Sequence, residues 1–286
     1  MIRRTVIAVP LLAVIAMVAA CVPDAPPERD WTVRAHSITV HRGEDRDGGD
    51  EPYVIQIGFR SKLGVRGSTS TSIRSQCRSQ KLFPNDAAPD GTTLEIPPGS
   101  ADITFPGVLN LDLLDLAAGT VPFEVLGTLS FVMERDGIFE SCAVTDALEN
   151  ALLPVLRDAL AMLIANSPVP PTEQEIVNLI VSNIGNFVAA AGNLIGAVIE
   201  GLGNPDDVIG VAAQIHLPTT GGLTDLVNTA FAIGGLFAPG LEHGFVPIEG
   251  LPSELQIRVG TLSPSRADFR FTTPAADYTY QSRVTR

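Results

Sequence analysis

A long stretch of this sequence carries no basic side chain, and regions with a strand-like pattern surround it. Between Asp158 and Gln256 there is no Lys or Arg, although acidic residues continue throughout. Much of this stretch is apolar with interspersed Ala and Gly. Such segments cannot all be exposed to solvent, so other parts of the chain have to cover them. We therefore expect a β-rich fold interrupted by an apolar insertion.

Alternating apolar residues predict the strands of this fold. In the first part of the chain the alternation covers Ile38 and Val40, residues 53–59 and residues 123–131. Further strand patterns follow at residues 211–218, 255–259, 269–271 and 278–284. The predicted fold class is mainly β, with an inserted apolar helical hairpin.

The insertion has the spacing of two helices. Residues 146–166 place apolar side chains at helical spacing, and Pro154 favours a helix that starts late in this segment. Thr172 followed by Glu175 has the spacing of a capping box, which predicts a second helix from there to about residue 202. A third apolar stretch, residues 223–236, is rich in glycine and less regular.

Two roles are open for this helical insertion. One is a second hydrophobic core, in which the helices pack on each other and on the sheets. The other is a surface that contacts membrane or binds lipid. A transmembrane helix is disfavoured because the second helix contains several Asn residues and has no basic flanks.

The amino terminus has the layout of an export signal: Arg3 and Arg4, an apolar run and then small residues. Val18-Ala19-Ala20-Cys21 resembles the lipobox of bacterial lipoproteins. This resemblance implies that residues 1–20 are removed, that the Cys21 thiol is acylated, and that the chain is anchored to the outer face of the cytoplasmic membrane. Residues 21–30 would form a proline-rich spacer. The alternative is an ordinary cleaved signal in which Cys21 has no role.

The remaining cysteines are Cys77 and Cys142. Disulfides persist outside the cytoplasm, so we expect these two to be bridged, with two free buried thiols as the alternative. Too few Cys and His residues are present for a metal site built from Cys and His ligands. We expect His36, His41, His216 and His243 to be surface or turn residues.

An acidic loop between two predicted strands is the first candidate site. Residues 43–53 hold five carboxylates and three glycines, and a divalent cation such as Ca²⁺ would offset the repulsion between these charges. The acidic loop followed by Glu51-Pro52-Tyr53-Val54 resembles the first calcium loop of C2 domains. These are eight-stranded antiparallel sandwiches that bind Ca²⁺ and often phospholipid. Asp45 and Glu51 stand at the separation of two acids in that motif, with Glu51 in place of an Asp.

A second calcium loop of the same family is similar to two separated segments of this chain. Its first half is similar to residues 131–137 and its second half to residues 206–210, with the helical insertion between them. The resemblance divides the chain into a first part of the C2-like sandwich at 31–136, the insertion at 137–204, and a second part at 205–286 with a further apolar segment at 221–240. The candidate Ca²⁺ ligands are Asp45, Asp47, Glu51, Glu134, Asp136 and Asp207.

Charge and motifs exclude other classes of function. With 19 basic against 32 acidic residues the chain is a poor partner for nucleic acid. No nucleophile, phosphate-binding or dinucleotide-binding motif is present, so we expect no enzyme activity. The sequence predicts an exported, lipid-anchored binding protein that binds an unidentified protein or lipid ligand with Ca²⁺ at the acidic loops. The alternative is a lipid-binding or membrane-perturbing protein that acts through the insertion without metal.

Overall fold

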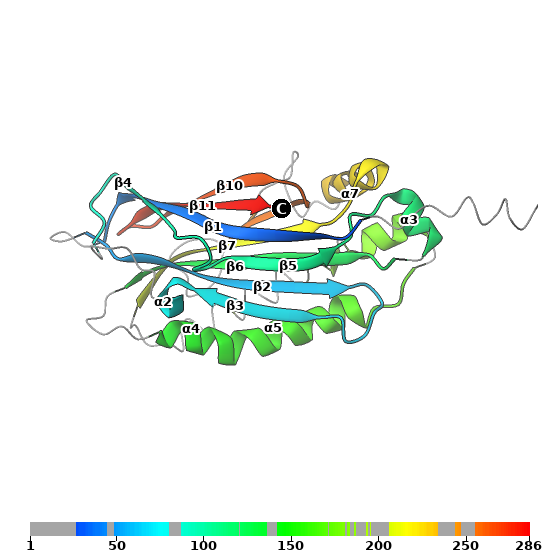
Figure 1. The fold of residues 1–286 in the computed structure, drawn as a ribbon, viewed down its shortest axis with the longest axis horizontal. Coiled ribbons are helices and arrows are strands. Elements are labelled where there is room, and N and C mark those ends of the chain that lie inside the picture. Colours follow the sequence, from blue (N-terminus) through cyan, green and yellow to red (C-terminus); the bar gives the residue numbers. More distant parts are fainter. Residues whose placement is uncertain are drawn as a thin grey trace, which may run out of the picture.

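Two β-sheets and a layer of helices make up the computed structural model of the protein (Figure 1). The structure describes residues 27–44, 49–79, 87–119, 121–135, 142–170, 172–180, 182–183, 186, 193, 195, 206–233, 244–246 and 255–286. The expectation of a mainly β fold that also contains helices is confirmed. The assignments of Cys21 and of the export signal lie outside the described residues.

The five-stranded sheet is organised around its longest strand, β1. Three antiparallel partners run along β1, and β10 pairs with β11 at the edge of the sheet. The strands are β1 (Arg29–Arg42), β4 (Thr92–Glu95), β5 (Ile103–Val108), β10 (Ser265–Thr272) and β11 (Asp277–Thr285). Because β4 and β5 pair with opposite halves of β1, that strand connects the two ends of the molecule.

The six-stranded sheet has the order β3-β2-β6-β7-β9-β8. Its strands are β2 (Pro52–Lys62), β3 (Ser70–Ser75), β6 (Glu124–Arg135), β7 (Asp206–Leu217), β8 (Gly244–Val246) and β9 (Leu255–Thr261). Neighbouring strands are antiparallel except β7 and β9, which are parallel. This parallel pair departs from the fully antiparallel sandwich that the sequence led us to expect.

Aromatic side chains of β10 and β11 fill the space between the two sheets. Phe269, Phe271, Tyr278 and Tyr280 are fully buried there with aliphatic residues of β1, β2, β6 and β7. Gly210 in β7 leaves the room for one of these rings, since a Cβ at this position would lie 2.1 Å from Cδ1 of Phe271. The two sheets therefore form a packed sandwich.

Helices cover the other face of the six-stranded sheet and make it a buried middle layer. Residues 143–165 form a helical segment composed of α4 (Ala143–Ala147), η1 (Leu148–Leu152), α5 (Leu153–Leu160) and η2 (Ala161–Ala165). Every fourth residue of it is buried in the core against β2, β6, β7 and β9: Leu148, Leu152, Leu156, Leu160 and Ile164. Figure 1 shows this segment running beside β3 and β2.

The first helix begins earlier than the sequence indicated and continues through Pro154. The preceding turn η1 is π-helical, and the N–H of Leu153 donates to the carbonyl of Leu148, five residues back. Each π turn holds an extra residue. These turns offset the drift of a four-residue spacing around an α-helix of about 3.6 residues per turn, which keeps all five buried residues on one face.

The second predicted helix begins where expected. Residues 173–180 are helical, and the Glu175 N–H donates to Thr172 Oγ1 while that hydroxyl donates to Glu175 Oε2. Two further helices, α3 (Leu113–Ala118) and α7 (Gly221–Ile233), contact each other at one end of the sandwich. Of the described helices, none has both the length and the apolar character needed to cross a bilayer.

Candidate functional site

The acidic segments singled out in the sequence meet at one end of the sandwich, which we call the acidic end. β1 ends there at Arg42, β2 begins there, β6 ends and β7 begins. The register pairs Pro52 with Glu134 and Glu134 with Asp207. The two separated halves of the expected second loop therefore lie on neighbouring strands. In the sequence, the helical segment is inserted between these two strands.

A buried carboxylate fixes the described part of the acidic loop. Asp50 is fully buried, and its carboxylate accepts hydrogen bonds from the Tyr278 hydroxyl and from the Glu44 N–H at 2.9 and 3.0 Å. The neighbouring Gly43 N–H donates to Asp90 Oδ1 at 2.7 Å. Burial and then the hydrogen bond to Asp50 raise the pKa of Tyr278 above its usual value, so the hydroxyl keeps its proton. Asp50 thereby joins both ends of the loop to the opposite sheet.

Glu134 is a second buried acid at this end. It is 1% exposed, and its Oε1 lies 3.5 Å from the Glu51 backbone nitrogen. The Arg135 N–H in turn donates to the Glu51 carbonyl at 3.3 Å. The charge of Glu134 contributes to the raised pKa of Tyr278, so both buried acids influence the same phenol. Carboxylate oxygens are the ligands that a hard divalent cation prefers.

The structure describes part of the predicted ligand set. The Glu51 backbone nitrogen lies beside the Glu134 carboxylate, and the backbone of Asp207 is opposite Glu134. Asp45, Asp47 and Asp136, and the side chain of Asp207, lie outside the described residues. Among the described side chains no group of three acids, His or Cys could hold a metal ion. Ca²⁺ binding therefore stays a prediction. The sequence reasoning did not single out Asp50 or Tyr278, although Asp50 directly precedes the Glu51-Pro52 motif.

A disulfide braces the acidic end, as expected. Cys77 and Cys142 are bonded, with a Cα–Cα distance of 5.8 Å. Cys77 belongs to the short helix α2 (Gln76–Ser79) that follows β3, and Cys142 directly precedes α4. Beside the disulfide, Arg78 contacts Asp146 at 2.6 Å and Glu149 at 2.5 Å. These contacts join the start of the helical layer to the edge of the six-stranded sheet.

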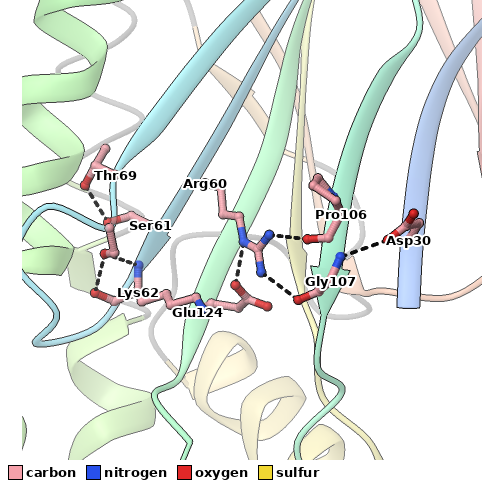
Figure 2. A network of polar contacts seen from close by, with 9 residues as sticks. Asp30, Arg60, Ser61, Lys62, Thr69, Pro106, Gly107 and Glu124 are labelled. Atoms are coloured by element: carbon pink, nitrogen blue, oxygen red, sulfur yellow. Dashed lines mark hydrogen bonds and ion pairs between the residues drawn. The ribbon is translucent and has the colours of Figure 1, made fainter. Parts of the chain in front are cut away.

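The opposite end is held by a buried ion pair. Arg60 Nε donates to Glu124 Oε2 at 2.7 Å, and the side chains are 15% and 4% exposed. The same guanidinium donates to the carbonyls of Pro106 and Gly107, and the Gly107 N–H donates to Asp30 Oδ1 at 2.9 Å. Figure 2 shows this network reaching from β2 and β6 across β5 to the start of β1.

Polar side chains also lie inside the sandwich, and one of them corrects an expectation. His216 was expected at the surface or in a turn, but it lies in β7 opposite Leu126 and is 6% exposed. Burial lowers its pKa to about 4, so the imidazole is neutral at pH 7. Neither ring nitrogen has a hydrogen-bond partner, and the same holds for the side-chain polar atoms of Gln56 in β2 and Thr128 in β6. The expectation was wrong because helices and the second sheet bury both faces of β7.

The other histidines follow the expectation more closely. His41 is exposed near the end of β1, where its Nε2 lies 2.8 Å from Thr279 Oγ1. His36 is half-buried in the same strand, and His243 lies outside the described residues.

Comparisons of the chain with protein-family models, curated proteins and solved structures find no match.

Proposed function

We propose that the protein is an exported, lipid-anchored, non-enzymatic binding protein that presents its acidic end to a ligand. The observation that carries this proposal is the direction of β1. The strand begins at Arg29, eight residues after Cys21, and ends at Arg42 beside the acidic loop. With 14 residues it spans about 45 Å. A chain anchored through Cys21 would hold its acidic end away from the attachment point and free to meet a partner.

Calcium at the acidic end is the second part of the proposal, with Asp45, Asp47, Glu51, Glu134, Asp136 and Asp207 as the candidate ligands. What supports it is the convergence of the three acidic segments that surround Asp50 and Glu134. Both of these acids are buried, and a nearby cation would lower the electrostatic cost of holding two negative charges close together. A C2-like sandwich with a helical insertion is the architecture that we propose around this site.

Flotation with lipid vesicles tests the anchor. The full-length protein expressed in a bacterium that acylates lipoproteins should float with vesicles, and Cys21→Ser should abolish flotation. The disulfide variant Cys77→Ser with Cys142→Ser is the matched control, because it replaces two other cysteines and leaves the acylation site in place. Flotation that survives Cys21→Ser, or a mature chain whose mass lacks acyl groups, would contradict the anchor.

Thermal unfolding with Ca²⁺ and with chelator tests the metal. A cation that binds only the folded state adds about 2.7 kcal/mol to the free energy of unfolding when its concentration is a hundredfold above Kd. We expect Asp45→Asn with Asp136→Asn to remove this stabilisation. Asp158→Asn with Asp225→Asn is the matched control, since both acids are exposed and lie away from the acidic end. An unchanged melting temperature in wild type, or an equal shift in both double variants, would refute Ca²⁺ binding.

A further inference from the structure

Exposed apolar side chains gather at the end of the sandwich opposite the acidic end. The described residues include six large apolar side chains that are exposed, and four of them lie at this end, between 36% and 67% exposed. They are Val65, Leu113, Leu114 and Val169, which we call the apolar tip. Of the other two, Met162 lies in η2, the last turns of helix before Val169, and Val155 lies in α5. None of the six is at the acidic end.

Contacts between the elements bring the apolar tip together. The Gly64 N–H donates to the Ile164 carbonyl at 3.1 Å, which joins the loop of Val65 to the segment of Val169. The Leu63 N–H donates to the Phe123 carbonyl at 2.7 Å, between the end of β2 and the residue before β6. Leu113 packs against Gly222 at the start of α7. The exposed side chains therefore stand on a connected framework.

The start of β1 lies at the same end. Arg29 pairs with Val108, the last residue of β5, and α3 with Leu113 and Leu114 follows five residues later. The network around Arg60 and Glu124 fastens this point to the six-stranded sheet through Gly107 and Asp30 (Figure 2). The start of β1 is thus connected to both sheets.

The length of the spacer limits how an anchored molecule can stand on its membrane. From Cys21 to Arg29 the chain reaches no more than about 29 Å when fully extended. β1 spans about 45 Å. If the acidic end rested on the bilayer with β1 upright, Arg29 would stand beyond the reach of the spacer. The spacer allows the upright molecule only with the apolar tip toward the lipid.

Charges of both signs stand around the apolar tip. Lys62 and Arg66 flank Val65, and Arg66 is exposed. The acids of α3 are engaged in its capping: the Leu114 and Asp115 N–H groups donate to Asp112 Oδ1, and the Asp112 N–H donates to Asp115 Oδ2. These acids keep their charge, so the exposed apolar side chains and the short spacer, together with Lys62 and Arg66 beside headgroup phosphates, carry the argument for a lipid surface.

From these observations we infer that the apolar tip rests on the bilayer in which Cys21 is anchored and holds the acidic end outward. This inference rests on the proposed acylation of Cys21. The occupant of the tip is a lipid surface. A second copy of the chain is the competing occupant, which the test below separates from lipid.

Tryptophan substitutions with brominated lipids test which end faces the bilayer. Leu114→Trp places an indole on the tip, and Val169→Trp is a second variant at the same end. Ala275→Trp places one at an exposed position in the turn between β10 and β11, next to the residue whose carbonyl accepts from Arg42 at the acidic end. Each acylated full-length variant is reconstituted in vesicles of phosphatidylcholine and phosphatidylglycerol, with and without brominated acyl chains. The native Trp31 also emits, although it is fully buried. Its emission is measured in the wild type and subtracted as background.

We expect brominated lipid to quench most of the added emission of Leu114→Trp and Val169→Trp, and to leave that of Ala275→Trp unchanged. Equal quenching at both ends, or none at the tip in protein that floats with the vesicles, would overturn the orientation and leave the anchor standing. Loss of flotation in wild type would refute the anchor, and the orientation with it. Unquenched tip emission together with a dimeric mass in light scattering would assign the tip to a second copy and refute the lipid contact.

Discussion

The two ends of the sandwich differ in what they expose and in what they bury. The apolar tip exposes Val and Leu side chains above an ion pair, Arg60 with Glu124, that is largely shielded from water. The acidic end exposes carboxylates above a buried carboxylate, Asp50, that accepts from a phenol on the opposite sheet. At each end a buried polar contact joins strands that are far apart in sequence. The chemistry of the exposed layer is opposite at the two ends.

In the proposed function, one long strand separates the end that is attached to the membrane from the end that meets a ligand. β1 starts at the apolar tip and ends at the acidic loop, so the fold itself sets the distance between them. The covalent brace differs as well, because the disulfide lies near the acidic end while the apolar tip has only noncovalent contacts among its described residues. Substitutions at the two ends should therefore act through different terms of the folding free energy.

The largest effect is expected at the ion pair of the apolar tip. Glu124→Gln leaves the Arg60 guanidinium shielded from water without a counter-charge. We expect a loss of about 3 to 5 kcal/mol in the free energy of unfolding, measured by urea denaturation. Arg60→Met with Glu124→Leu is the matched control, because it removes both charges and should recover most of the loss. A loss below about 1 kcal/mol for the single variant would mean that water screens this pair.

The brace of the acidic end is expected to contribute almost as much. Cys77→Ser with Cys142→Ser opens a loop of 65 residues, and the chain-entropy relation gives a loss of about 4 kcal/mol. The melting temperature of the oxidised wild type against the double variant measures it, with Cys21→Ser as the control that leaves the disulfide intact. If hydrogen exchange in the double variant increased equally at both ends, the disulfide would not be a local brace.

Much of the fold could be read from the sequence where alternation and burial agree. The strands around Ile38, Tyr53 and Phe131 were predicted because each alternates, and Cys77 with Cys142 was predicted because only these two thiols remained. The parallel pairing of β7 with β9 could not be read, since strand pairing depends on contacts distant in sequence. Pro154 misled the helix start because a π turn accommodates it, and no local pattern announces such a turn.

The candidate site was predictable in outline only. The acidic segments around Glu51, Glu134 and Asp207 do converge, as the order of the strand and loop patterns indicated. The acid that organises the described loop is Asp50, and its partner Tyr278 lies more than two hundred residues away, so no spacing rule connects them. His216 was misplaced for a related reason: a neutral histidine in a strand has no local signal of burial when the covering helices come from another segment.

His216 lies near the end of β7, on the side of the apolar tip. It should make the free energy of unfolding sensitive to acid. Its folded pKa of about 4 lies below the unfolded value of 6.5, so the unfolded chain binds a proton first as the pH falls. The contribution of neutral His216 to the free energy of unfolding is complete above pH 6.5. It falls by about 3 kcal/mol as the pH decreases toward 4. Urea denaturation at pH 7 and pH 4.5 measures the loss, and His216→Leu should reduce it. An equal acid sensitivity in wild type and variant would assign the loss to other groups.

The smallest effect is expected at the acidic end, from Tyr278→Phe. This change removes a hydroxyl that donates to the buried carboxylate of Asp50, while the two contacts from the Glu44 N–H remain. A hydrogen bond to a charged group contributes about 2 kcal/mol to the free energy of unfolding, against about 1 kcal/mol for a neutral pair.

The matched control is Tyr280→Phe two residues on, because the Tyr280 hydroxyl donates to the neutral Ser130 Oγ at 3.3 Å between the same two sheets. Burial raises the pKa of both phenols, so both donate across the neutral pH range. Urea denaturation should rank Tyr278→Phe as the more destabilised variant, and hydrogen exchange at the Glu44 amide should speed up in that variant alone. Equal losses would mean that Asp50 does not organise the acidic loop through Tyr278, and the two ends would then differ in their exposed layers and in the disulfide, but not through this buried contact.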